Sequence, residues 1–213
     1  MIRAVLIDLD GTLVDSTPAL FQVYQKFLAY YGKKGTQEEF TSLIGPSIDE
    51  IVAILKEKYG LKESTNDLAT MYVSTLMKQG FEGTELFPDA KRVIEELKKQ
   101  GVKLGIVTSG THALVKICLD PLKMMDVFDT IVTSEDVKKA KPNPEMYQLA
   151  IEKLGVAAAE TVAIEDSEAG KNAAVEAGLE VVMITHGKAP IFKEVVNCSN
   201  WNEIDEWLKS KRK

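Results

Sequence analysis

The sequence predicts an α/β fold, a Rossmann-like doubly wound parallel sheet with an all-helical segment inserted after the first strand. Two observations predict it. Short apolar, β-branched runs alternate with helical segments along most of the chain, whereas residues 16–80 carry helix signals alone. Continuous apolar runs are typical of strands buried on both faces. Short strand–helix–strand links imply right-handed crossovers and parallel neighbours.

Five short runs are expected to form the strands of the sheet. Their apolar residues are mostly consecutive rather than alternating with polar ones, as in a sheet covered by helices on both sides. In chain order the expected strands are Ala4–Ile7, Lys103–Thr108, Thr130–Val132, Val162–Ile164 and Val181–Ile184.

Helices are expected between the later strands, and a glycine follows three of them, as is common just past a helix end. Asn143 and Pro144 suit the N-cap and first turn of the middle one. A last amphipathic helix precedes the basic tail. The expected core helices are Asp89–Gln100, Asn143–Leu154, Glu168–Ala177 and Trp201–Leu208.

Residues 16–80 are expected to form a helical cap that resembles a lid. Thr17 and Pro18 suit the N-cap and first position of a helix to Tyr31, Ser47 and Glu50 make a capping box, and Ser64–Lys78 forms a further helix. The joints are expected at Val14–Ser16 and Gly80–Pro88. The predicted domains are therefore a core of residues 1–15 and 81–213, and a cap of residues 16–80.

Composition excludes several classes of function. The 213 residues include 45% hydrophobic and 27% charged ones, which suits a folded core with a small insertion. A net charge of −6 gives no support to a nucleic-acid or membrane surface. No stretch reaches the roughly 18 apolar residues of a membrane helix. Cys118 and Cys198 lack metal-ligand spacing and suit reduced thiols in a cytoplasmic protein. We expect the protein to be a monomer or a weak homodimer.

Polar side chains follow each predicted strand. Asp8 and Asp10 follow the first strand, Thr108 and Ser109 the second, Lys141 a loop after the third, and Glu165-Asp166-Ser167 the fourth. Ligands of open parallel sheets bind beyond the carboxyl ends of the strands. We therefore expect carboxylates, hydroxyls and one lysine to gather at one edge.

Such a group of carboxylates needs a cation, and oxygen-rich sites of this kind suit Mg²⁺. A carboxylate there can attack phosphorus to give an aspartyl-phosphate. A second carboxyl two residues along can move the proton. Threonine and lysine can hold the remaining phosphoryl oxygens. The residues predict Mg²⁺-dependent phosphoryl transfer.

Four segments, in order and spanning the chain, resemble the haloacid dehalogenase-like hydrolase superfamily. Asp8-Leu9-Asp10-Gly11-Thr12-Leu13-Val14 resembles its first motif, DxDGTL/V, and Thr108 its strand-end Ser/Thr. Lys141 in Lys141-Pro142-Asn143-Pro144 and the acidic Glu165-Asp166-Ser167 resemble the third and fourth motifs. The position of the helical insert resembles the superfamily's C1-type cap.

The resemblance implies a role for each matching residue. Asp8 would be the nucleophile and Asp10 the general acid/base. Thr108, Ser109 and Lys141 would bind the phosphoryl group. The implied metal set is Asp8, Asp10 with its main-chain carbonyl, Asp166 and Glu165.

The substrate choice rests on the cap. Dehalogenase relatives lack the aspartate matching Asp10. Phosphonatase-type members use a cap lysine and β-phosphoglucomutase-type members a cap arginine, but residues 35–55 contain neither. The fourth motif is more mutase-like. We expect a phosphatase of a small phosphorylated metabolite, near the phosphoglycolate phosphatase-like branch, with a β-phosphoglucomutase-type isomerase as the alternative.

Several smaller points stay open on the sequence alone. Thr108 and Ser109 could instead cap a helix starting near Thr111. His112 could reach a substrate or lie on a helix surface, and His186 suits a loop. The Gly45-Pro46-Ser47 turn could reach the active site or merely join two helices.

Overall fold

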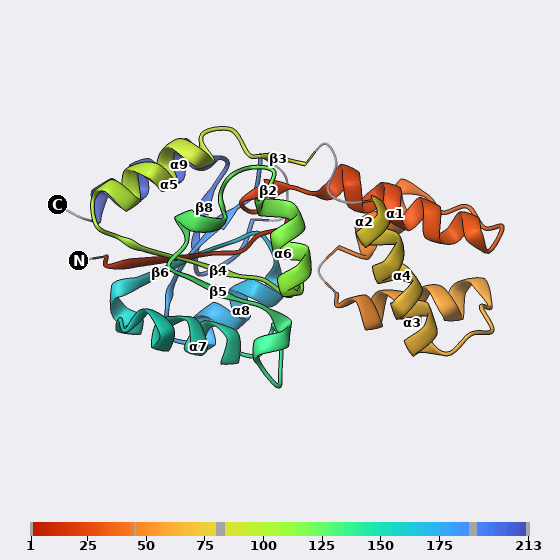
Figure 1. Cartoon of the computed structure of the whole chain (residues 1–213). Helices are drawn as coiled ribbons and strands as arrows, with labels where there is room; N and C mark the ends of the chain where they lie inside the picture. Colours follow the sequence, from red (N-terminus) through yellow and green to blue (C-terminus); the bar gives the residue numbers. More distant parts are fainter. Residues whose placement is uncertain (1, 45, 80–83, 188–190, 212–213) are drawn as a thin grey trace. The chain divides into compact units, whose positions relative to one another are not determined.

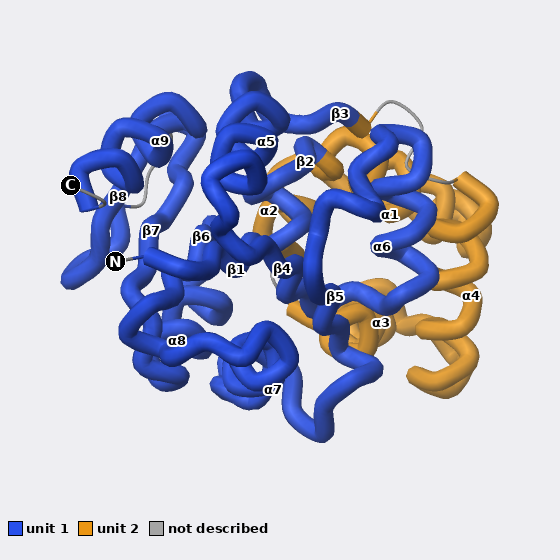
Figure 2. Tube along the Cα trace, turned by 60° about the vertical axis from the view of Figure 1, so that its left-hand side comes forward, with its two compact units in different colours: residues 1–15, 85–213 blue, residues 16–84 orange. Residues whose placement is uncertain are grey.

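The computed structural model describes residues 2–44, 46–79, 84–187 and 191–211, which divide into two compact units (Figures 1 and 2). Unit 1 comprises residues 1–15 and 85–213, and unit 2 comprises residues 16–84. The cap boundary expected after residue 80 falls outside the described residues, as does Gly45 of the expected turn.

Unit 1 is built on a parallel sheet of strand order β5-β4-β1-β6-β7-β8. β1 lies at its centre, pairing Ala4–Ile7 with Lys103–Ile106 on one side and Thr161–Ile164 on the other. The strands are β1 (Ala4–Ile7), β4 (Lys103–Val107), β5 (Thr130–Val132), β6 (Thr161–Glu165), β7 (Glu180–Ile184) and β8 (Val196–Cys198). All four residues of β1 are buried, as expected for a strand covered on both faces.

All five predicted strands are present, so the α/β prediction is confirmed, but β8 was not predicted. Its sequence, Val-Asn-Cys, is too short to give an apolar run, and it forms a strand by pairing with Val182–Ile184 of β7. A two-stranded antiparallel ribbon of β2 (Val14–Asp15) and β3 (Glu85–Leu86) lies where the chain leaves and re-enters unit 1.

Helices cover both faces of the sheet (Figure 1). α5 (Ala90–Lys99) and α9 (Trp201–Ser210) pack on one face, and α7 (Glu145–Leu154) and α8 (Glu168–Glu176) on the other. Met146, Tyr147 and Ala150 of α7 are fully buried in the core beneath it. α6 (His112–Leu119) and three short 3₁₀ turns, 125–127, 134–136 and 158–160, complete the unit.

Helices joined by short loops make up unit 2, and its described residues contain no strand. It contains α1 (Thr17–Tyr30), α2 (Gln37–Ser42), α3 (Ile48–Tyr59) and α4 (Thr65–Gln79). The predicted capping box is present at α3, where Ser47 and Glu50 exchange hydrogen bonds. The six-residue α2 was not predicted. It begins where the Thr36 side chain accepts a hydrogen bond from the Glu39 N–H.

Two predicted N-caps, Thr17 and Asn143, are each wrong by one residue. α1 begins at Thr17 itself, with Ser16 as N-cap, and α7 begins at Glu145 with Pro144 as N-cap. Asn143 instead accepts a hydrogen bond from the Glu145 N–H, a local turn that asparagine side chains readily make. α6 is capped by Thr111, not by Thr108 or Ser109. Within the described residues, no helix is long and apolar enough to span a membrane.

Candidate active site

A tight loop after β1 carries Asp8 and Asp10. The Leu9 carbonyl accepts hydrogen bonds from the N–H groups of Leu13 and Val14, and the Gly11 N–H donates to the Val14 carbonyl. The Asp8 N–H extends the pairing with β6 by donating to the Ile164 carbonyl at 3.0 Å. The loop therefore fixes Asp8 at the carboxyl end of the central strand, with the half-buried Asp10 two residues along.

Gly11 is required by both backbone conformation and space. Its φ of +81° lies in the left-handed region, which costs other residues free energy. A Cβ at this position would also lie 2.2 Å from Asp166 Oδ2. A side chain at this position would therefore displace the Asp166 carboxylate.

Thr12 and Trp201 hold the same loop from two sides. The Thr12 hydroxyl donates to Asp166 Oδ1 at 3.3 Å, and the buried Trp201 indole N–H donates to the Thr12 carbonyl at 3.1 Å. Sequence reasoning missed both contacts. Trp201 lies 189 positions further along the chain, so only the fold brings it to the loop.

Lys141 lies at the centre of the site. Its side chain is 4% exposed, and its ammonium donates to Asp8 Oδ1 at 2.6 Å, Glu165 Oε1 at 2.5 Å and the Val107 carbonyl at 2.7 Å. An ammonium has three N–H groups, so each of them has an acceptor. The lysine thereby joins the ends of β1, β4 and β6.

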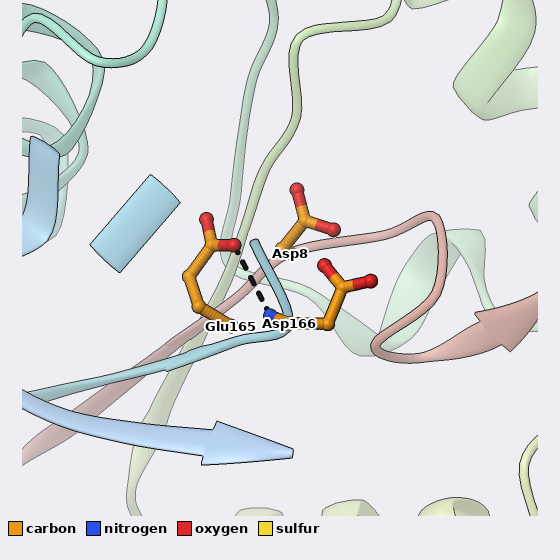
Figure 3. A group of neighbouring side chains, drawn as sticks. All are labelled: Asp8, Glu165 and Asp166. Atoms are coloured by element: carbon orange, nitrogen blue, oxygen red, sulfur yellow. Dashed lines mark hydrogen bonds between the residues drawn. The ribbon is translucent and has the colours of Figure 1, made fainter. Parts of the chain in front are cut away.

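Three carboxylates meet at the same place. Asp8, Glu165 and Asp166 each place an oxygen within 4.8 Å of the others, at the carboxyl ends of β1 and β6 (Figure 3). Glu165 is completely buried, and Asp8 is 8% exposed. Asp10 does not contribute a side-chain oxygen to this group.

Burial and mutual repulsion alter the titration of these groups. Burial, reinforced by the charges of Glu165 and Asp166, raises the pKa of Asp8 well above its usual range, against the opposing pull of Lys141. The same effects, burial first and then the Glu165 charge, raise the pKa of Asp166 to about 7. Burial disfavours the Lys141 ammonium, but Asp8 and Glu165 outweigh that and leave its pKa above the ordinary value.

A bound divalent cation would relieve this repulsion. Asp8 and Asp166 are hard oxygen donors from adjacent strand ends, the ligand type that Mg²⁺ takes. The buried Asp8 and the partly exposed Asp166 both have raised pKa values, so both resist ionisation until a cation offsets their charge. The residues at this site are therefore suited to bind Mg²⁺.

Thr108 and Ser109 follow β4 as predicted. Thr108 is 2% exposed, and its hydroxyl oxygen accepts a hydrogen bond from the Gly110 N–H at 3.1 Å. Because Thr111 caps α6, neither Thr108 nor Ser109 is used as the cap of that helix.

The two histidines have different surroundings. The His112 ring lies 2.9 Å from Asp136 Oδ2 and is half-exposed, which fits a position on the surface of α6. His186 stacks on Phe87, and its Nε2 lies 2.7 Å from the Gly11 carbonyl oxygen. Since a carbonyl only accepts, Nε2 carries the hydrogen. His186 is therefore a loop residue, as predicted, but one that contacts the loop of Asp8 and Asp10.

Comparison with known proteins decides the family. The family model described as haloacid dehalogenase-like hydrolase matches residues 5–184. The chain belongs to this family. It is 31% identical to a phosphorylated carbohydrates phosphatase of Thermotoga maritima, over 97% of this chain and 98% of that protein. It is 33% identical to a phosphoglycolate phosphatase of Yersinia pseudotuberculosis, over 87% and 82% of the two chains.

A solved structure adds a third relative. A β-phosphoglucomutase candidate from Thermotoga maritima superposes with a TM-score of 0.81 at 29% identity, covering 98% of this chain and 99% of that one. Together with the family match, these relatives confirm the predicted superfamily and the enzyme class: the chain is a phosphatase of this family.

Proposed function

We propose that the protein is a Mg²⁺-dependent phosphatase that hydrolyses a small phosphorylated metabolite through an aspartyl-phosphate on Asp8. One observation carries the proposal. The Asp8 carboxylate lies at the end of the central strand, 2.6 Å from the Lys141 ammonium and beside Asp166. This arrangement pairs a nucleophile with positive charge for a transferring phosphoryl group.

Asp8 and Asp166, with the main-chain carbonyl of Asp10, would hold the Mg²⁺. When bound, the ion neutralises the carboxylates and the charge of the phosphoryl oxygens. The raised pKa values of Asp8 and Asp166 support this assignment, because a cation is what would let both groups ionise near neutral pH.

In the first step, an Asp8 carboxylate oxygen attacks phosphorus while the bond from phosphorus to the ester oxygen breaks. Asp10 gives its proton to the leaving oxygen, which departs as an alcohol. Lys141, Thr108 and Ser109 would hold the phosphoryl oxygens during the transfer. The buried position of Lys141 strengthens its attraction to that charge.

In the second step, water attacks the phosphorus of the aspartyl-phosphate. Asp10 takes a proton from the water, and the bond between phosphorus and the Asp8 oxygen breaks. Inorganic phosphate leaves, and the Asp8 carboxylate is restored. The tight turn from Leu9 to Val14 supports both roles, because it holds the two aspartates in one fixed relation.

We further propose that unit 2, residues 16–84, acts as a cap that selects the substrate. Its helical content and its insertion between Asp15 and Glu85 support this role. The β2–β3 ribbon, in which Asp15 pairs with Glu85, would serve as the pair of joints.

The relatives suggest the substrate class. Phosphorylated carbohydrates and phosphoglycolate are both small anionic esters, and the chain resembles a phosphatase named for each. The alternative is an isomerase of the β-phosphoglucomutase type, favoured by the similarity to the Thermotoga maritima structure and by the Glu165-Asp166 pair.

A panel of phosphate esters tests the proposal. Purified protein is incubated with Mg²⁺ and each ester, including phosphoglycolate and β-glucose 1-phosphate, and both released phosphate and isomerised sugar phosphate are measured. We expect phosphate release that EDTA abolishes and Mg²⁺ restores. Isomerisation without release would contradict the phosphatase assignment, and release that is independent of metal would contradict the proposed Mg²⁺ requirement.

A further inference from the structure

Lys141 is held by a carboxylate that is itself held by a phenol. Glu165 Oε1 accepts the Lys141 ammonium at 2.5 Å and the Tyr147 hydroxyl at 2.6 Å. Tyr147 lies on α7, is completely buried, and belongs to the core beneath that helix. Its ring also lies beside the lysine, with the Lys141 Nζ 5.4 Å from the ring centroid. None of the four family motifs includes this tyrosine.

The hydrogen bonds of Glu165 leave little room for any other partner. Besides Lys141 and Tyr147 on Oε1, its Oε2 accepts the Ser167 hydroxyl at 3.2 Å. Oε2 also accepts the Asp166 N–H at 3.3 Å, the contact drawn in Figure 3. A carboxylate offers about four acceptor sites on its two oxygens. Because four donors already contact these oxygens, Glu165 would have to give up a hydrogen bond in order to bind a metal ion.

The fold also encloses the Glu165 carboxyl group. A Cβ at Gly170, in the first turn of α8, would lie 2.0 Å from its carboxyl carbon. Tyr147 contacts the same carboxyl group from α7, so Glu165 lies against two helices that pack on the same face of the sheet.

We propose that Tyr147 is a positioning residue for Lys141. Its hydroxyl fixes Glu165, and Glu165 fixes the ammonium that holds the transferring phosphoryl group, so Glu165 serves the lysine rather than the metal. The inference rests on the proposed function for its effect on turnover. A flexible four-carbon side chain loses much rotamer freedom when it is held, and this pair holds it before substrate arrives.

The variant Tyr147→Phe tests the inference, because it removes one hydroxyl and keeps the ring. Thr161→Val is the matched control. Thr161 is also buried, and its hydroxyl donates to the Ala157 carbonyl at 2.9 Å, but it lies at the opposite end of β6 from Glu165. We expect kcat to fall about 10- to 100-fold in Tyr147→Phe, the range seen when an outer partner of a site residue is removed. We expect Thr161→Val to stay within about twofold of wild type.

Mn²⁺ binding, measured by electron paramagnetic resonance, distinguishes a role of Glu165 in positioning Lys141 from a role as metal ligand. Tyr147→Phe should bind Mn²⁺ as wild type does, and Glu165→Gln should lose less affinity than Asp166→Asn. A kcat for Tyr147→Phe within twofold of wild type overturns the inference. A loss of Mn²⁺ affinity in Glu165→Gln equal to that in Asp166→Asn also overturns it.

A structural measurement that does not depend on turnover tests the inference separately from the proposed function. Should the wild-type protein release phosphate from no ester, the proposed function fails on its own. Crystal structures of wild type and Tyr147→Phe then compare the contact of Lys141 Nζ with Asp8. A displaced or disordered lysine supports the inference, and an unchanged lysine overturns it. If Tyr147→Phe does not fold, the same comparison is made with Glu165→Gln.

Discussion

Replacing Asp166 by asparagine should stabilise the metal-free protein at alkaline pH while removing a proposed metal ligand. The pKa of Asp166 is raised from 3.8 to about 7, chiefly by burial and then by the Glu165 charge. A group whose folded pKa is raised holds its proton longer in the folded state. Below about pH 4 the carboxyl group is protonated in both the folded and the unfolded state, so its ionisation costs the folded state nothing. As pH rises toward 7 and above, its ionisation lowers the free energy of unfolding.

The magnitude follows from the size of the shift. A difference of about 3 pKa units, at about 1.4 kcal/mol each, gives a ceiling of about 4 kcal/mol. Asparagine removes the ionisation but keeps an oxygen to accept the Thr12 hydroxyl. The gain in the free energy of unfolding should thus be near zero at about pH 4 and approach the ceiling at about pH 8.

Urea unfolding in EDTA, at several pH values, measures this directly. Asp126→Asn is the control, because Asp126 is an exposed aspartate in the 3₁₀ turn 125–127 of the same unit. Added Mg²⁺ should stabilise wild type more than Asp166→Asn, since a ligand that binds only the folded state stabilises it. A stability difference between Asp166→Asn and wild type that is the same at every pH would refute the reasoning.

Three further predictions concern the loop after β1. Gly11→Ala should lower the free energy of unfolding by at least about 1–2 kcal/mol because of the left-handed backbone, which unfolding curves measure. It should also weaken Mn²⁺ binding, measured by titration, because the added Cβ would push Asp166 aside. Trp201→Phe should cost about 1–3 kcal/mol, since the buried Thr12 carbonyl loses its donor; an unchanged unfolding midpoint would count against that contact. Asp10→Ala should slow both formation and breakdown of the phospho-enzyme by about 10²- to 10⁴-fold in rapid-quench kinetics, and a loss in only one step would exclude a shared acid/base.

The sequence predicted the elements whose signals are local. The strand Ala4–Ile7 and the capping box at Ser47 are each indicated by residues close together in the sequence, and both are present. β8 could not be predicted, because Val196–Cys198 becomes a strand only through its pairing with β7. The N-caps of α1 and α7 were predicted one residue away from their positions in the structure. The actual N-caps, Ser16 and Pro144, make no side-chain capping hydrogen bond, so no sequence signature reveals them.

The candidate site follows the same division. Asp8, Lys141, Glu165 and Asp166 stand at strand ends or in the loops after them, so the topology alone predicted that they gather, and the structure brings them together. The residues that hold them were not predicted. Tyr147, Trp201 and His186 each touch the site through a hydrogen bond across at least 18 positions, and each could equally be core or loop on sequence grounds.

The central claim is that Asp8 becomes phosphorylated. Wild-type protein is mixed with the best ester from the panel and Mg²⁺, quenched in acid within milliseconds, and digested for mass spectrometry. We predict a phosphoryl adduct on the peptide that contains Asp8, labile to hydroxylamine, and absent from Asp8→Asn. Turnover of the ester by Asp8→Asn at a rate near wild type, or an adduct on another residue, would contradict the account.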